Sequence, residues 1–484
     1  MFLLVAVRKT CFSLSTIKDL EWAVKASARP LLPNMGRHGC STPAQKNLKE
    51  SPVNPQHHRS LSLLKKLATS WNQAAVRWVL LGRYSRDHVF EDDVDLAIHP
   101  EDLTLALALL QQTTDEHQGV ITQVFRYEYN AFAVVVAQKE STGWGFVSID
   151  ICSEFRFDGR LLQSGAELVG ARQQAHVEWL WLPSNHNAFA HYLLKSAAKR
   201  RFNEEGRSYL SSLDLNPRQT TEVILGSNAA KEIELWLSSS KPLKARALTG
   251  AFAQRYRHSI SSRWREFRRF WLRLRKPKGL HVAITGPDGV GKSTVSELAQ
   301  GSIGPCFRSL ETAHLSLRTT TMDLSTRGVA PYTQKNRGLA ASLLKTLVLV
   351  ASFNRLFWRW IWQQKRKHGL FWSDRHFSDF IADPQRFRVS LPLWIRRLSW
   401  RFVPSPDLTI VLVASAETIQ ERCDEVNLEQ TRHQVDQYEE LARYDKSLYR
   451  ISAEQSADQV ADEIATAVIG LLARKHENDG WMTF

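Results

Sequence analysis

A glycine-rich run around a lysine is the segment of this sequence best suited to chemistry. In "HVAITGPDGVGKSTVSELA" (281–299), an apolar run precedes the glycines and a helical pattern follows them. Glycines let backbone N–H groups turn towards phosphate oxygens, and a helix N-terminus adds a favourable dipole. Lys292 can neutralise the β- and γ-phosphates of ATP, and the Ser293 hydroxyl can ligate Mg²⁺. This Walker A pattern predicts an ATP site made of Gly286, Pro287, Asp288, Gly289, Val290, Gly291, Lys292, Ser293 and Thr294.

Two later segments narrow the chemistry. "FWSDRHFSDF" (371–380) ends an apolar run with Asp374 and Arg375, a carboxylate and a guanidinium that we expect beside the phosphate loop. "PDLTIVLVASAETIQER" (406–422) reads as another core strand, followed by a helix that carries Arg422. A carboxylate suits Mg²⁺ and a guanidinium suits a phosphate.

Together, Asp288, Asp374, Arg375 and the pair Pro406-Asp407 resemble the motifs of the thymidylate kinase family of nucleoside monophosphate kinases. The resemblance covers about residues 279–475. It implies that the γ-phosphoryl group of ATP moves to an acceptor phosphate or hydroxyl. Asp374 would help to position Mg²⁺ and Arg375 would clamp a phosphate. Arg422 and Arg432 would be lid residues, and catalysis would be mostly positioning and electrostatics.

One segment departs from that family. Where thymidylate kinases have a serine-rich stretch, this chain has "HFSDFIADPQRFR" (376–388), with Pro384 and two added arginines. This form resembles a divergent branch of thymidylate kinase-like proteins, so the acceptor is not expected to be strictly thymidylate. His314, in "TAHLSLR", either lines the acceptor pocket or is structural.

A second group of carboxylates lies upstream, in "VLLGRYSRDHVFEDDVDLAI" (79–98). Asp93 and Asp95 are two apart on an expected strand, so their side chains point to one face, where they repel unless a cation lies between them. Mg²⁺ is the expected cation. Gly82 ends the preceding strand, where a phosphate could approach the backbone. Asp150 lies on a later strand that could pair beside the first.

Gly82, Asp93 and Asp95 resemble the pattern of the polymerase-beta-like nucleotidyltransferase superfamily. The resemblance implies that Asp93 and Asp95 bind two Mg²⁺ ions, and that Asp150 holds one of them and helps to activate a hydroxyl. Gly82 and Arg83 would contact the nucleotide, with Arg83 in place of a small residue. The alternatives are a domain that binds without turnover and a simple solvated strand edge.

The elements that position these residues fall into three blocks. Residues 61–236 contain short apolar runs at 76–82, 93–98, 121–126, 131–137 and 145–151, then helical sequence, and predict an α+β unit with a mixed sheet. Residues 279–475 predict an α/β domain with a parallel sheet flanked by helices. Residues 1–60 are expected to be a poorly structured extension and 476–484 a tail.

The connector at 237–278 is dense in arginine. Ile260, Trp264, Phe267, Trp271 and Leu274 fall on one helical face, which we expect to pack on a domain. The apolar segment 339–362 is long enough to span a membrane. It contains Lys345, Arg355 and Arg359, so we expect a buried helix of a soluble domain instead.

The composition of the chain limits its partners and location. A net charge of +15 over 484 residues favours polyanionic partners, namely nucleotides, nucleic acid or an anionic membrane. Five scattered cysteines, without metal-site spacing, fit a reducing, cytoplasmic location.

We expect an ATP- and Mg²⁺-dependent phosphotransferase fused to a nucleotidyltransferase-like domain, with a small phosphorylated or hydroxyl acceptor and a possible homodimer. The alternative is an ATP-binding regulatory or assembly protein, with an inactive nucleotidyltransferase-like domain, that acts at nucleic acid or membrane through its Arg-rich connector.

Overall fold

The computed structural model describes most of the chain from residue 55 to residue 477. The described ranges are 55–82, 93–128, 130–140, 143–239, 245–256, 277–314, 338–422 and 427–477, with residues 243, 263–264, 267–268, 270–271 and 274 between them. The predicted extension lies outside this description as far as residue 54. Helix α2 (Pro55–Gln73) begins before the boundary that the sequence suggested at residue 61.

The first sheet is mixed and has five strands in the order β1-β2-β5-β4-β3. Strands β2 and β5 pair in parallel and the other neighbours are antiparallel. On β2, Val94, Leu96 and Ile98 point into a core shared with α2 and α3 (Leu103–Glu116). Each apolar run expected here contains or lies within one strand, namely β1 (Trp78–Leu80), β2 (Asp93–Ile98), β3 (Gly119–Glu128), β4 (Ala131–Glu140) and β5 (Gly143–Cys152).

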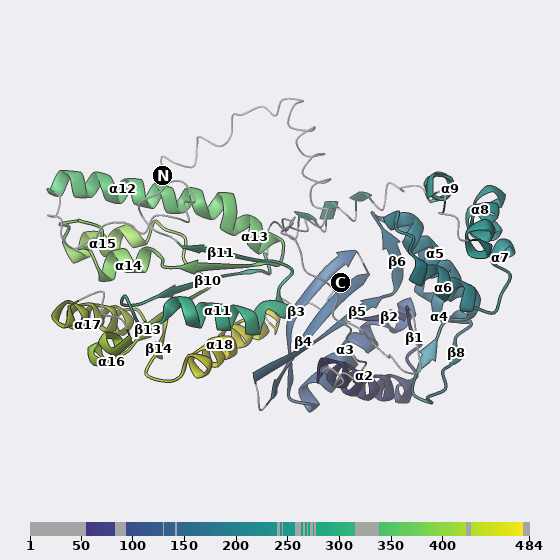
Figure 1. Cartoon of the computed structure of the whole chain (residues 1–484), viewed down its shortest axis with the longest axis horizontal. Coiled ribbons are helices and arrows are strands. Elements are labelled where there is room, and N and C mark those ends of the chain that lie inside the picture. Colours follow the sequence, from purple (N-terminus) through teal and green to yellow (C-terminus); the bar gives the residue numbers. More distant parts are fainter. Residues whose placement is uncertain are drawn as a thin grey trace, which may run out of the picture. The chain divides into compact units, whose positions relative to one another are not determined.

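Helices and two hairpins follow this sheet (Figure 1). Ser184, Asn203 and Asn216 cap the N-termini of three of the helices through their side chains. Phe189, Leu210 and Trp236 belong to a core that these helices share. The elements are β6 (Glu154–Phe157), β7 (Arg160–Ser164), α4 (Gly165–Gly170), β8 (Gln173–Gln174), β9 (Trp181–Leu182), α5 (Asn185–Lys199), α6 (Glu204–Ser212), α7 (Pro217–Leu225), α8 (Ser227–Ser238) and α9 (Ala245–Arg255), while the short η1 (Pro100–Asp102) lies between β2 and α3.

The second sheet is parallel throughout, as the sequence predicts. Its order is β11-β12-β10-β13-β14, formed by β10 (Leu280–Thr285), β11 (Leu310–His314), β12 (Leu370–Asp374), β13 (Leu408–Val413) and β14 (Leu448–Ser452). Apolar residues of β13 alternate between two cores, one on each face of the sheet. Buried central strands of this kind need helices on both faces.

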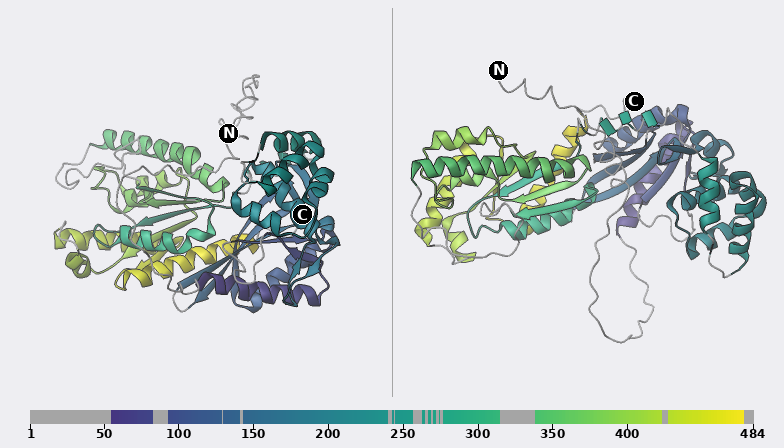
Figure 2. Two further views of the ribbon diagram at one scale, coloured as in Figure 1. Left: turned by 45° about the vertical axis from the view of Figure 1, so that its right-hand side comes forward. Right: turned by 90° about the horizontal axis from the view of Figure 1, so that it is seen from above.

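Those helices are present on both faces (Figures 1 and 2). The core with α11 (Lys292–Ile303) and α18 (Ala457–Glu477) covers one face. The core with α12 (Leu339–Leu356), α14 (Phe377–Ala382) and α17 (Leu428–Tyr444) covers the other. The remaining elements are η2 (Gly304–Cys306), the π-helical segment η4 (Phe357–Ile361), α13 (Trp362–Arg366), α15 (Leu393–Trp400) and α16 (Ala416–Arg422).

The expectation of a buried helix at 339–362 is wrong. Within the described residues, one helical segment, Leu339–Arg366, is long and apolar enough to cross a membrane by length and composition, and 22% of its most apolar window is buried. Ser342, Thr346, Leu349 and Phe353 are buried. A single line of contacts holds the helix against the domain, so its opposite face remains exposed.

The connector also differs from the expectation. Trp264, Phe267 and Trp271, which we expected to pack on a domain, are exposed. The rings of Trp264 and Phe267 stack on each other, with centroids 5.7 Å apart. Ile260 lies outside the described residues.

Candidate active site

The phosphate loop begins where β10 ends, at the carboxyl edge of the parallel sheet. Gly286 has a φ of 151°, and a Cβ there would lie 2.5 Å from the carbonyl oxygen of Leu412 on the neighbouring strand. Gly291, with a φ of 98°, is the last residue before α11. Both positions require glycine, because an L side chain is strained in this conformation. The loop therefore turns directly into the N-terminus of a helix, where anions are favoured.

Lys292 folds back over this loop. Its ammonium donates hydrogen bonds to the carbonyl oxygens of Gly286, at 3.1 Å, and Pro287, at 2.6 Å. Burial, helped by the positive charge of Arg375, lowers the pKa of Lys292 to about 8. The carboxylates of Asp288 and Asp374 act in the opposite direction. The geometry thus holds a buried cation at the position expected for the β- and γ-phosphates.

Asp374 reaches the same edge from β12. It is paired with Ile284 of β10 on one side and with His314 of β11 on the other. The Nδ1 atom of His314 lies 2.9 Å from Oδ2 of Asp374. Burial raises the pKa of Asp374, but the hydrogen bond of His314 and the charge of Lys292 outweigh it, so the pKa is lowered overall. His314 thus contacts the candidate site directly.

The second oxygen of the Asp374 carboxylate is suited to a metal ion. Oδ1 is buried and makes no hydrogen bond with any described residue. A buried carboxylate oxygen without a partner costs free energy unless a cation is available to it. Ser293, one residue after Lys292, supplies an exposed hydroxyl in the first turn of α11. These hard oxygen donors fit Mg²⁺.

Arg375 is held in an unusual backbone conformation. Its φ is 79°, which is rare for a residue other than glycine. Its N–H donates to the carbonyl oxygen of Ile284 at 2.8 Å. Its guanidinium forms ion pairs with Asp288 of the phosphate loop and, at 3.1 Å, with Asp379. Asp379 also accepts a hydrogen bond from the hydroxyl of Tyr438.

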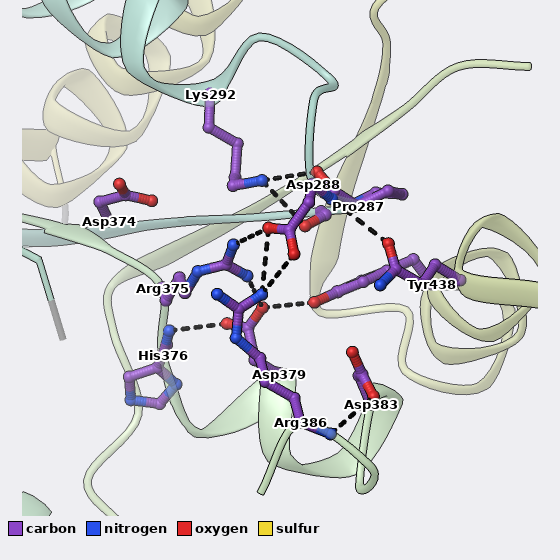
Figure 3. Close-up of polar contacts among 12 residues, drawn as sticks. Pro287, Asp288, Lys292, Asp374, Arg375, His376, Asp379, Asp383, Arg386 and Tyr438 are labelled. Atoms are coloured by element: carbon purple, nitrogen blue, oxygen red, sulfur yellow. Dashed lines mark hydrogen bonds and ion pairs between the residues drawn. The ribbon is translucent and has the colours of Figure 1, made fainter. Parts of the chain in front are cut away.

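This network fixes the charge of Arg375. Burial lowers its pKa, but Asp379, Tyr438 and Asp288 raise it well above its ordinary value. The backbone N–H of His376 donates to the other oxygen of Asp379 at 3.0 Å. Figure 3 shows Arg375 between Asp288 and Asp379. The guanidinium is therefore a rigid cation next to the phosphate loop.

Arg386 adds a second guanidinium at Asp288. Its Nη1 atom lies 3.0 Å and 2.8 Å from the two carboxylate oxygens (Figure 3). Burial raises the pKa of Asp288, but Arg375, Arg386 and Lys292 together lower it well below its usual range. Arg386 is one of the two arginines that distinguish the 376–388 segment from the family pattern. The structure thus connects that segment to the phosphate loop.

The two predicted lid arginines have other partners. Arg422 donates to the carbonyl oxygen of Ala453 at 2.8 Å. Arg432, on α17, forms an ion pair with Glu417 of α16 at 2.7 Å. Arg422 of α16 is thus held by the residue that follows β14, and Arg432 is held by α16. Residues 423–426, between α16 and α17, lie outside the described residues, and the lid role of the arginines stays a prediction.

The upstream carboxylates lie on neighbouring strands of the first sheet. Asp95 on β2 is directly opposite Asp150 on the parallel strand β5, so both project from the same face. Lys195 of α5 reaches this face, and its ammonium lies 3.0 Å from Oδ2 of Asp95. Asp93 is paired with Ser148, while its side chain lies outside the description.

The rest of that predicted site is described in part. Gly82 is exposed, with a φ of 97°, and its carbonyl oxygen accepts a hydrogen bond from the hydroxyl of Tyr209 at 3.3 Å. Arg83 lies outside the described residues. Among the described side chains, no group of three or more His, Cys, Asp or Glu residues could hold a metal ion. The three-carboxylate site that we predict includes Asp93, so it stays a prediction.

Three partners in these sites were missed by sequence reasoning. Asp379 is four residues after Arg375, a helical spacing that suits an ion pair, so the sequence held a signal for it. Tyr438 and Lys195 are far from their partners in the sequence, and nothing in the local sequence marks them.

The fold and site together define a class. A parallel sheet flanked by helices, with a phosphate loop at the carboxyl end of β10, is compatible with an α/β P-loop domain. No protein-family model matches the chain.

A comparison with curated proteins agrees with this class. Over 202 residues the chain is 26% identical to a protein of Methanosphaera stadtmanae named "Probable thymidylate kinase"; the match covers 40% of this chain and 99% of that protein. This similarity supports a nucleotide-kinase-like function for the matching part of the chain.

Proposed function

We propose that the carboxyl-terminal half transfers the γ-phosphoryl group of ATP to a phosphate or hydroxyl group of a small acceptor, with Mg²⁺ as cofactor. The observation that carries this proposal is the convergence of Lys292, Asp374 and Arg375 at one edge of the parallel sheet. Ligands of open α/β sheets bind outside the carboxyl ends of the strands.

Each residue has a role that follows from its position. The backbone N–H groups of the loop bind phosphate oxygens, and Lys292 leaves its carbonyl partners to neutralise the β- and γ-phosphates. Ser293 and Asp374 would hold Mg²⁺, which supplies further charge neutralisation at the phosphates. Arg375, fixed by Asp379, stabilises the charge on the transferred group. This catalysis is positioning and electrostatics.

The acceptor is proposed to differ from thymidylate, although the similar archaeal protein is named a probable thymidylate kinase. Arg386 belongs to the segment 376–388, which differs from the family pattern, and its guanidinium lies within hydrogen-bonding distance of the Asp288 carboxylate. An acceptor that carries a phosphate competes with Asp288 for Arg386, because a guanidinium prefers a doubly charged oxyanion. We therefore favour an acceptor that is itself phosphorylated.

The first sheet supports a second candidate function, a nucleotidyltransferase-like site. Its support is the parallel register that sets Asp95 beside Asp150. The ammonium of Lys195 occupies one oxygen of Asp95, so a metal ion must displace it or share the carboxylate. Asp93, Asp95 and Asp150 would then hold Mg²⁺, with Gly82 and Arg83 near the nucleotide.

The test uses the purified full-length chain with ATP labelled at the γ- or the α-phosphate. The acceptors are a panel of nucleoside monophosphates, including thymidylate, and sugar phosphates. Transfer of γ-label to one acceptor is the expected result. Lys292→Ala should reduce it about a hundredfold to a thousandfold. Lys231→Ala, at an exposed lysine of α8, is the matched control.

The outcomes separate the proposals. Unchanged ADP release from Lys292→Ala would show that the kinase assignment is wrong. Transfer of α-label that disappears in Asp93→Asn/Asp95→Asn would support the nucleotidyltransferase-like site. ATP hydrolysis without any acceptor would favour the regulatory alternative.

A further inference from the structure

Helix α12 exposes apolar residues that a soluble domain would normally bury. The buried face contains Ser342 and Thr346 next to Leu349 and Phe353. On the opposite face, Leu344 and Leu347 are 64% and 67% exposed. Helices of soluble domains normally direct the apolar stripe to the core and the polar residues to water. The distribution here leaves an apolar face without a partner among the described residues.

Neighbouring elements extend that face. Trp394, Leu398 and Phe402, spaced by four residues along and just after α15, are exposed. Asn354 of α12 donates to the carbonyl oxygen of Phe402 at 2.7 Å, so the two elements are in contact. Figure 1 shows α12 along the outer edge of this domain with α15 beside it. We call this the α12–α15 surface, represented by Leu344, Leu347, Val348, Trp358, Trp394 and Phe402, each more than half exposed.

The segments that form the α12–α15 surface carry charges of one sign, and an acid of a neighbouring helix, Glu440 of α17, lies 3.8 Å from Arg397 of α15. Residues 338–373 and 385–405, which include all of α12, η4, α13 and α15, contain no Asp or Glu. They contain the exposed arginines Arg355, Arg359 and Arg401. Apolar and tryptophan side chains surrounded by arginines match the interface of a bilayer, where tryptophan lies at the headgroup level and cations attract anionic lipids.

We propose that the α12–α15 surface docks on an anionic lipid bilayer, with α12 lying in the plane of the interface. A second copy of the chain fits poorly, because it would press like charges together without an acid in these segments to pair with them. Nucleic acid would leave the leucines without an apolar partner. A spanning arrangement would place Lys345, Arg355 and Arg359 in the hydrocarbon region. The inference is independent of the proposed kinase reaction.

The test is flotation of the full-length protein with vesicles. One set contains phosphatidylcholine alone, and the other contains phosphatidylcholine and phosphatidylglycerol in equal amounts. The protein should float with the anionic vesicles, and less at high salt. Leu344→Gln/Leu347→Gln should weaken binding about tenfold or more. Arg355→Gln/Arg359→Gln should weaken it about tenfold.

The control is Leu235→Gln on α8, a leucine that is similarly exposed, at 59%. It should bind vesicles as the unchanged protein does. Unchanged thermal unfolding of the variants establishes that they are folded. The proposal is overturned if the protein ignores anionic vesicles or if Leu344→Gln/Leu347→Gln binds them normally. It is equally overturned if sedimentation shows a stable dimer that this double variant converts to monomer. Binding of DNA that the same double variant abolishes would also overturn it.

Discussion

The two sheets neutralise their carboxylates in different ways. Beside the parallel sheet, Asp288 of the phosphate loop and Asp379 of α14 are held by guanidiniums, and Arg375 between them is almost completely buried. In the mixed sheet, Asp95 meets one lysine, Lys195, and both side chains are about a third exposed, at 33% and 34%. The first arrangement is rigid and multiply bonded, whereas the second is a single contact at the end of a flexible side chain.

This difference has a chemical consequence. A site of fixed arginines is ready for an anion, because its cations are already oriented and desolvated. A carboxylate paired with one lysine is ready to exchange that cation for another. We therefore propose a phosphate site at the parallel sheet and, at the mixed sheet, a cation site that depends on what replaces Lys195.

The largest expected effect is on stability. Asp379→Asn should lower the free energy of unfolding by about 3–5 kcal/mol, because it removes the charge of one of the two carboxylates that hold the buried Arg375. Urea unfolding followed by tryptophan fluorescence measures this change. Asp95→Asn, the counterpart in the mixed sheet, should cost less than about 1 kcal/mol. Equal losses in the two variants would remove the contrast between the sheets.

The next effect is on catalysis at the candidate active site beside the parallel sheet. Arg375→Ala should lower kcat about a hundredfold to a thousandfold, because the guanidinium acts on the transferred group. Arg386→Ala, whose side chain is more exposed, should mainly raise KM for the acceptor, by about tenfold. Initial rates at varied acceptor concentration separate the two. If both variants changed only KM, Arg375 would be a binding residue and its proposed role would be wrong.

A smaller effect concerns the pH dependence of stability in the part of the chain that contains the mixed sheet. Burial, together with Lys195, lowers the pKa of His191 on α5 to about 3. The unfolded chain then binds an extra proton below the ordinary pKa of 6.5, so stability is lost as pH falls from 6.5 towards 3. His191→Leu should reduce the slope of unfolding free energy between about pH 4 and 6 by up to about 1.4 kcal/mol per unit. An identical slope would show that His191 does not titrate in this way.

The smallest effect tests the exchangeable cation. Lys195→Met should strengthen Mn²⁺ binding at the mixed sheet by up to about fivefold, because it frees Asp95 from its ion pair. Manganese relaxation measurements report this affinity. Lys231→Met, at the exposed lysine of α8, serves as the control. Weaker Mn²⁺ binding in Lys195→Met would mean that Lys195 supports the site rather than competing with the ion.

Most of the fold and of the candidate site that could be predicted follows from local sequence patterns. The phosphate loop and the Asp374-Arg375 pair are set by adjacent residues, and buried parallel strands have a sequence pattern of their own. The order of strands then brings His314 and Asp374 together, as neighbours in register. The sequence left two roles open for His314; its contact with Asp374 places it beside that carboxylate, and a role in an acceptor pocket stays a prediction.

Contacts between distant residues could not be predicted in the same way. Tyr438 meets Asp379, and Lys195 meets Asp95, only because helices far along the chain pack over the strands. The exposure of side chains could not be predicted from the sequence either. The leucines of α12 read as core residues, because hydrophobicity alone does not distinguish a protein interior from a lipid interface.

The left-handed backbone of Arg375 has a consequence for directed evolution. A φ of 79° costs an L residue roughly 1–2 kcal/mol, whereas glycine adopts it freely. In a saturation library at this codon, selection for thermal resistance should still return arginine, because glycine relieves the backbone but leaves the buried carboxylate of Asp379 without its cation, a loss of about 3–5 kcal/mol. Glycine and asparagine should be enriched only after Asp379 is replaced, since the backbone and the ion pair make opposite demands on this position.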